Sequence, residues 1–86
     1  DAVAPGKGLK CNLCTKILEK IKAVAGDDPD EATADKALDK GCRVLGKRLG
    51  RLCKGLVKKF REQLSQELQN GDEPRDICTA IGLCKA

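Results

Sequence analysis

The sequence contains no histidine, methionine, tryptophan or tyrosine, and its single aromatic residue is Phe60. Without histidine, neither a Ser-His-Asp triad nor a histidine-dependent phospholipase site is available. None of the free hydroxyl groups has a recognisable base beside it: Thr15, Thr33, Ser65 and Thr79. We assign two pairs of acidic residues to helix surfaces or caps: Glu62 with Glu67, and Asp72 with Glu73. We therefore expect a protein that is not an enzyme and that uses no cofactor.

Two further absences bear on cellular location. No apolar run approaches the roughly 20 residues of a membrane-spanning helix. Neither Asn12 nor Asn70 begins an N-glycosylation sequon. Because methionine is missing altogether, we interpret the chain as a mature product whose signal and pro-segments have been removed.

What the chain does have is six cysteines in 86 residues. A domain of this size buries only about 60% of the surface of its unfolded chain and usually needs added stabilisation. Cys11 and Cys14 form a C-x-x-C motif, but no second pair follows at zinc-site spacing, and no strand surrounds it as in a redox motif. We expect disulfide bonds and no metal site, and hence a secreted protein or one stored in secretory or cytolytic granules.

Apolar residues recur at helical spacing along most of the chain. Residues 1–8 are small and punctuated by glycine and proline, so we expect a flexible N-terminal extension followed by one folded domain, residues 9–86. The pattern predicts four to five helices and no strand. They cover residues 9–26, 30–45, 49–68 with a bend near the middle, and a short segment from 74 to 82.

Six cysteines allow fifteen pairings, and the sequence alone does not choose among them. Cys42 and Cys53 flank a glycine-containing connection between two predicted helices, which suits a local bridge. If the first and last helices run antiparallel, the other four would form a nested pair: Cys11–Cys84 and Cys14–Cys78.

This framework resembles the saposin-like family over residues 9–85. The shared features are a C-x-x-C at the start of the first helix, a mid-chain pair about ten residues apart, and a final pair near the C-terminus. The stretches Arg51-Leu52-Cys53-Lys54 and Ile77-Cys78 after Pro74 are most similar to the NK-lysin and granulysin branch. The resemblance implies the nested pairing, a leaf of helices in two lobes, and a membrane-active antimicrobial or cytolytic role.

The charge is concentrated in one segment. The net charge is only +4, but residues 40–61 hold nine basic residues and no acidic one: Lys40, Arg43, Lys47, Arg48, Arg51, Lys54, Lys58, Lys59 and Arg61. Five of them, at 47, 51, 54, 58 and 61, form one helical stripe opposite the Leu49–Leu52–Leu56–Phe60 face. Such a helix lies on anionic lipid, where each cation contributes about 1 kcal/mol. We predict these nine residues as the contacts to anionic membrane lipids.

Disrupting a bilayer requires apolar area to leave the core, so we expect the two lobes to hinge apart. Gly46 and Gly50 are the hinge candidates, in a segment that also holds Gly41 and Gly55, because each glycine weakens a helix interior by about 1 kcal/mol. The alternative is that these glycines end helices or allow close packing. The missing tryptophan and tyrosine favour surface carpeting over deep insertion, and the missing histidine excludes the acid trigger of the protozoan pore-forming relatives.

Two other roles stay open. Saposin-type lipid binding and transfer is one, although such relatives tend to be acidic and glycosylated, unlike this chain. Nonspecific binding of nucleic acid or lipopolysaccharide is another, because the basic stripe attracts phosphate groups while no aromatic platform exists for bases. No protein partner is implied, and an oligomer on the membrane is left open.

Overall fold

The structure, a computed structural model, describes the backbone of residues 5–84 and the side chains of residues 10–84. It contains four helices and, within those residues, no strand: α1 (Pro5–Ala25), α2 (Glu31–Arg43), α3 (Gly46–Asn70) and α4 (Pro74–Ala80). The predicted all-helical fold is confirmed. Helix α1 begins at Pro5, earlier than the periodicity predicted. Residues 1–4 lie outside the described residues, and the flexible extension stays a prediction.

Helix ends follow local chemistry. The Asp30 carboxylate accepts a 2.8 Å hydrogen bond from the Thr33 backbone N–H and caps α2, and this bond lowers the pKa of Asp30. Helix α3 ends at Gly71, whose φ of 81° lies in the left-handed region. The Asp72 N–H then bonds the Glu67 carbonyl and the Gly71 N–H bonds the Leu68 carbonyl, both at 3.2 Å. This pattern satisfies carbonyls that a helix end would leave unpaired.

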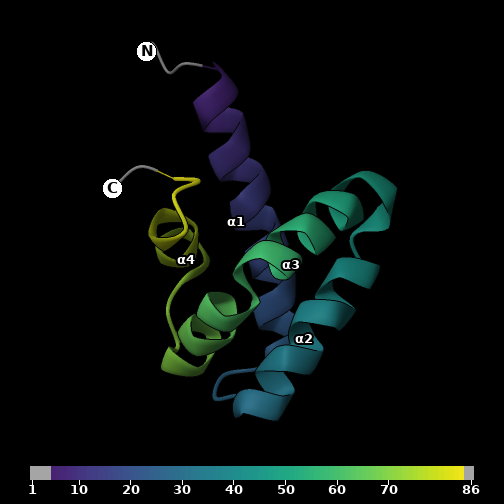
Figure 1. Cartoon of the computed structure of the whole chain (residues 1–86), viewed down its shortest axis with the longest axis vertical. Coiled ribbons are helices and arrows are strands. Elements are labelled where there is room, and N and C mark those ends of the chain that lie inside the picture. Colours follow the sequence, from purple (N-terminus) through teal and green to yellow (C-terminus); the bar gives the residue numbers. More distant parts are fainter. Residues whose placement is uncertain (1–4, 85–86) are drawn as a thin grey trace.

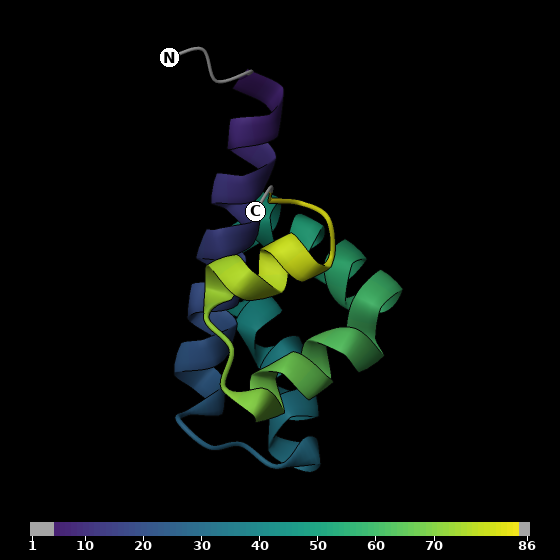
Figure 2. The same cartoon turned by 90° about the vertical axis from the view of Figure 1, so that its left-hand side faces the viewer.

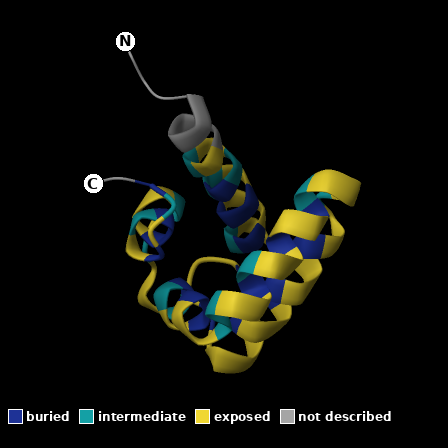
Figure 3. Ribbon diagram, turned by 45° about the horizontal axis from the view of Figure 1, so that its top comes forward, coloured by how far each residue is buried: buried dark blue, intermediate teal, exposed yellow. Residues whose placement is uncertain are grey.

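Helix α1 lies at the centre of the fold and contacts each of the other three helices. Figures 1 and 2 show α4 lying against α1 on one side, with α2 and the first half of α3 on the other. The inward faces of the helices are buried (Figure 3). The largest fully buried aliphatic side chains come from all four helices: Ile17, Leu18, Ile21, Leu38, Leu64, Leu68 and Ile77. Each contributes roughly 1.5–3 kcal/mol by leaving water, so an aliphatic core replaces the missing aromatics.

The predicted bend in the third helix is confirmed and lies at Phe60, whose φ of −123° and ψ of 26° are not helical. Neither hinge candidate lies at this bend. Gly46 has a φ of 82° and opens α3, whereas Gly50 is buried inside the helix. A Cβ at Gly50 would lie 3.0 Å from the Cys42 carbonyl oxygen, so Gly50 permits the close packing that was the alternative interpretation. Hinging at Gly46 and Gly50 stays a prediction.

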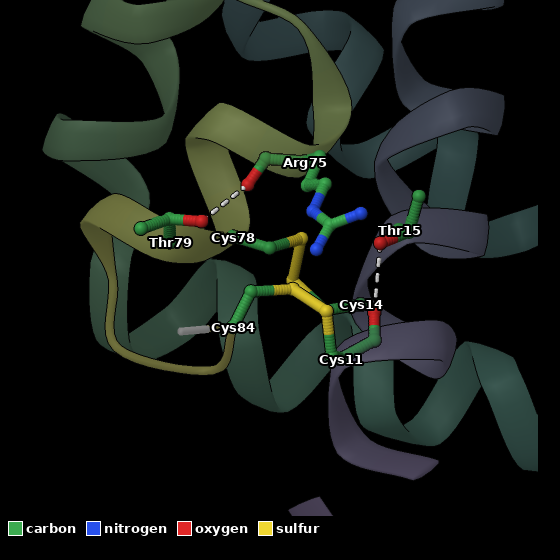
Figure 4. The surroundings of a disulfide bond; sticks show 7 residues. All are labelled: Cys11, Cys14, Thr15, Arg75, Cys78, Thr79 and Cys84. Atoms are coloured by element: carbon green, nitrogen blue, oxygen red, sulfur yellow. Dashed lines mark hydrogen bonds between the residues drawn. A yellow bond between two sulfur atoms is a disulfide. The ribbon is translucent and has the colours of Figure 1, made fainter. Parts of the chain in front are cut away.

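All six cysteines are paired as the resemblance implied. Cys11–Cys84 and Cys14–Cys78 lie side by side and tie α1 to α4 and the segment after it, with Cα–Cα distances of 4.6 and 6.0 Å (Figure 4). Cys42–Cys53 joins α2 to α3 at 5.2 Å. In the chain-entropy description, closing the outer loop stabilises the fold by about 4 kcal/mol and closing the short one by about 3 kcal/mol.

The crossing of α1 and α2 can be tested at Gly41. A Cβ there would lie 2.5 Å from Cγ1 and 3.1 Å from the Cα of Ile21, so Gly41→Ala must push the two helices apart. We expect a loss of about 1–3 kcal/mol in the free energy of unfolding. The control is Gly55→Ala, where the new Cβ meets nothing within 4 Å and the helix should gain up to about 1 kcal/mol. Denaturant unfolding of both variants checks the pair; equal effects would show that the α1–α2 contact is not tight.

Candidate functional site

Helices α2 and α3 form an antiparallel hairpin that carries the predicted charges. The direction follows from the cross-helix pairs: Cys42 bonds Cys53, whereas Asp39, earlier in α2, contacts Arg61, later in α3. Cys53, Val57 and Gly50 are the buried positions on the first half of α3. The small size of two of these residues lets α3 approach α2 closely along this line.

Five basic side chains line the junction between the two helices, and we call this set the basic seam: Arg43, Lys47, Arg51, Lys54 and Lys58. All five are exposed. They border two adjoining depressions of about 470 and 510 Å³, which share Arg43, Lys54 and the Cys42 of the disulfide. The structure therefore gathers cations from both helices into one surface, beyond the single-helix stripe that the sequence predicted.

Arg61, the last member of the predicted stripe, is held differently. Its guanidinium donates hydrogen bonds of 2.8 Å to Asp35 and 2.7 Å to Asp39 of α2. These bonds to Asp39 and Asp35 raise the pKa of Arg61, which stays charged. Two carboxylates thus compensate the charge of Arg61 at the end of the seam.

The remaining three predicted lipid contacts lie outside the seam. Lys40 and Arg48 are exposed and line neither depression. Lys59 is exposed on another face of α3, with its ammonium nitrogen 5.7 Å from the centre of the Phe60 ring. That distance is within the range of a cation–π interaction.

The leucine face of α3 is not the core face. Leu49, Leu56 and Phe60 are only half-buried, and 47% of Leu52 is exposed. Because α3 turns Gly50, Cys53 and Val57 toward α2, the leucine face is rotated to the edge of the fold. We expected apolar area to become exposed only when the fold hinges open, but part of it is already at the surface of the closed fold.

Three of the hydroxyl and carboxyl groups to which we gave no catalytic role are held by the helices or buried against them. The Thr15 and Thr79 hydroxyls donate to the carbonyls of Cys11 and Arg75, one helical turn earlier (Figure 4). Burial of the carboxyl, followed by the nearby Asp72, raises the pKa of Glu67, whose Oε2 is buried without a hydrogen-bond partner. In residues 5–84 the structure shows no acidic or cysteine cluster suited to a metal ion and no helix that is long and apolar enough to cross a membrane.

Comparison with known proteins agrees with this architecture. Residues 51–84 match the family described as Saposin-like type B, region 2. The solved structure of NK-lysin from pig superimposes with a TM-score of 0.81 at 34% identity, over 88% of this chain and 96% of that one. The chain belongs to the saposin-like family. Within the family, its similarity is to the NK-lysin type.

Two longer relatives carry the name antimicrobial peptide NK-lysin. The one from Equus caballus is 35% identical over 79 residues, 92% of this chain, and the one from Sus scrofa is 33% identical over 78 residues, 91% of this chain. This chain spans 54% and 60% of their respective lengths.

Sequence reasoning missed the two acidic partners of Arg61 in this saposin-like chain. A signal was present, because Asp35 and Asp39 are four residues apart and share a face of α2. This spacing does not identify Arg61 as the partner of the two carboxylates, because the partner depends on how far α3 is displaced along α2. The seam thus ends at two carboxylates.

The pairing of Arg61 leads to a prediction for binding to an anionic matrix. Arg61→Gln removes a cation at the end of the seam, where the two carboxylates of Asp35 and Asp39 keep the local charge negative and an anionic surface at a distance. Lys54→Gln removes a free cation from the centre of the seam. On a cation-exchange column we expect the Lys54→Gln variant to elute at clearly lower salt than the Arg61→Gln variant, although both change the net charge equally.

The Arg61→Gln variant also has an expected effect on stability. Arg61→Gln should lower the free energy of unfolding by about 1 kcal/mol or less, because the side chains of both ion pairs are about half exposed. In the elution experiment, identical elution of the two variants would contradict the conclusion that an anionic surface contacts the centre of the seam and not its Arg61 end.

Proposed function

We propose that the protein is a cationic, membrane-active antimicrobial protein, secreted or stored in granules, that binds anionic lipid and disrupts the bilayer. The observation that carries the proposal is the basic seam, five exposed cations from two helices on one surface. The shared ancestry with proteins named antimicrobial peptide NK-lysin supports the same conclusion.

Electrostatics supports attachment to lipid. Near an anionic membrane each lysine or arginine contributes about 1 kcal/mol, so five seam cations supply roughly 5 kcal/mol. Arg61 adds less, because Asp35 and Asp39 compensate it. The attraction acts within a Debye length, about 8 Å at physiological ionic strength, so added salt weakens it.

Disruption needs apolar contact as well as charge. The half-exposed leucine face of α3 lies on the same helix as Lys47, Arg51, Lys54 and Lys58. Helices that pair a cationic face with an apolar one bury the apolar face in the headgroup region. Insertion at this shallow depth, without tryptophan or tyrosine anchors, supports carpeting of the surface as the mechanism.

A second candidate function, lipid binding and transfer, is favoured by one observation. A groove of about 380 Å³ between α1 and α3 is lined mainly by apolar side chains. A transfer protein would extract lipid from zwitterionic as well as anionic vesicles and release no contents. Nonspecific attraction of nucleic acid or lipopolysaccharide follows from the seam alone and is a weaker proposal.

Dye release from vesicles tests the proposed function. We expect the protein to release dye from phosphatidylglycerol vesicles, to leave phosphatidylcholine vesicles intact, and to lose activity as salt is raised. Equal lipid extraction from both vesicle types without leakage would favour transfer.

The role of the seam is tested with the triple variant Arg51→Gln, Lys54→Gln, Lys58→Gln. Its matched control, Lys16→Gln, Lys20→Gln, Lys36→Gln, lowers the net charge equally at exposed positions outside the seam. Losing up to about 3 kcal/mol of attraction should raise the concentration needed for leakage by as much as about 100-fold in the seam variant, and far less in the control. Equal losses in both variants would show that only net charge matters.

A further inference from the structure

The groove between α1 and α3 has the composition of a site for a lipid chain. Its apolar lining comes from three parts of the fold, α1, the first part of α3 and the segment after α4: Leu13, Ile17, Leu52, Leu56, Phe60 and Leu83. Leu52, at 47% exposure, is the most exposed large apolar side chain that the structure describes within a helix. Single exposed leucines are common, but here one borders a continuous apolar depression.

Three cations stand among the residues that line this groove: Lys10 from α1, and Arg51 and Lys59 from α3. Among the lining residues that the structure describes, none is acidic. A groove with an apolar floor and a cationic edge complements a molecule with an apolar chain and an anionic head. The volume of about 380 Å³ is near the lower end of the range for ligand pockets, which fits one chain better than two.

We propose that this groove receives one acyl chain of an anionic phospholipid, with its headgroup held by Lys10, Arg51 and Lys59, while the fold stays closed. Arg51 also belongs to the basic seam, so the two surfaces meet at this residue. The seam attracts the membrane, and the groove then takes a chain from it. The choice of a membrane phospholipid rests on the proposed function, whereas the fit of a chain rests on the groove itself.

The groove exists with all three disulfides formed and with α1 and α3 packed in the fold. Access to it therefore does not require α2 and α3 to separate from α1 and α4. Leu52, Leu56 and Phe60 would exchange water for a lipid chain at the edge of the fold, and the fully buried Leu18, Leu38 and Leu64 would keep their packing.

Monomeric lysophosphatidylglycerol, below its critical micelle concentration, is the probe for this site. It carries one chain and an anionic head, and its binding does not depend on adsorption to a bilayer. We expect amide chemical-shift changes concentrated at Leu52, Gly55 and Leu56, and weaker binding of lysophosphatidylcholine. Lys59→Gln should reduce the preference between the two lipids.

Two variants alter the groove and one serves as the matched control. Leu52→Gln removes apolar lining at a half-exposed position, and Gly55→Leu adds bulk where a new Cβ meets nothing within 4 Å. Val44→Gln makes the same kind of change at a residue that is 62% exposed and lies outside the groove. We expect dissociation constants about fivefold higher or more for the two groove variants, and an unchanged one for Val44→Gln.

The outcomes separate this inference from the proposed function. No binding of lysophosphatidylglycerol, or equal weakening by Leu52→Gln and Val44→Gln, overturns the groove as the site. Circular dichroism and melting temperature establish that each variant is folded. Groove binding without vesicle leakage would refute the membrane-disrupting function but support the groove as a lipid site. Leakage without groove binding would support the membrane-disrupting function and overturn the groove as a lipid site.

Discussion

The close approach of α2 and α3 is the constraint on which the arrangement of this molecule depends. Nine cations in residues 40–61 repel one another, yet these helices stay packed. The Cys42–Cys53 bond fixes one end of the hairpin, and the missing side chain at Gly50 admits the Cys42 carbonyl oxygen. At the other end Arg61 bridges to Asp35 and Asp39. A covalent bond and local charge compensation thus hold a surface that electrostatics alone would separate.

This constraint also sets the rotation of α3, and the rotation produces both candidate surfaces. Because Gly50, Cys53 and Val57 face inward, the seam cations border α2 and the leucine face reaches the edge of the groove against α1. On the far side of α1, Cys11–Cys84 and Cys14–Cys78 fix α4 and the segment after it, and Leu83 in that segment completes the groove. A saposin-like leaf closed by three bonds can therefore expose charge and apolar area together without unfolding.

Much of this could be predicted from the sequence, for identifiable reasons. The helices follow from apolar periodicity and from residues that end or begin a helix, such as Gly71 and Pro74. The disulfide pairing follows from the cysteine spacing, which matched the family framework. The rotation of α3 could not be predicted, because the leucine row and the Gly50–Cys53–Val57 row are neighbours on the helix, and hydrophobicity alone favours burying the leucines. What decides is the backbone contact at Gly50, which depends on tertiary packing. The bridge from Arg61 was missed for a similar reason, since it depends on the displacement of α3 along α2.

The central claim is that the closed, disulfide-bonded molecule meets lipid through α3 and its two flanking surfaces. Hydrogen–deuterium exchange on phosphatidylglycerol vesicles measures this most directly, residue by residue, in the intact protein. The account predicts that amides around Leu52 and Leu56 become more protected on the vesicle, while those of Leu18 in α1 and Ile77 in α4 stay as protected as in solution. Loss of protection at Leu18 and Ile77 on binding would show that α2 and α3 separate from α1 and α4, and would contradict this claim.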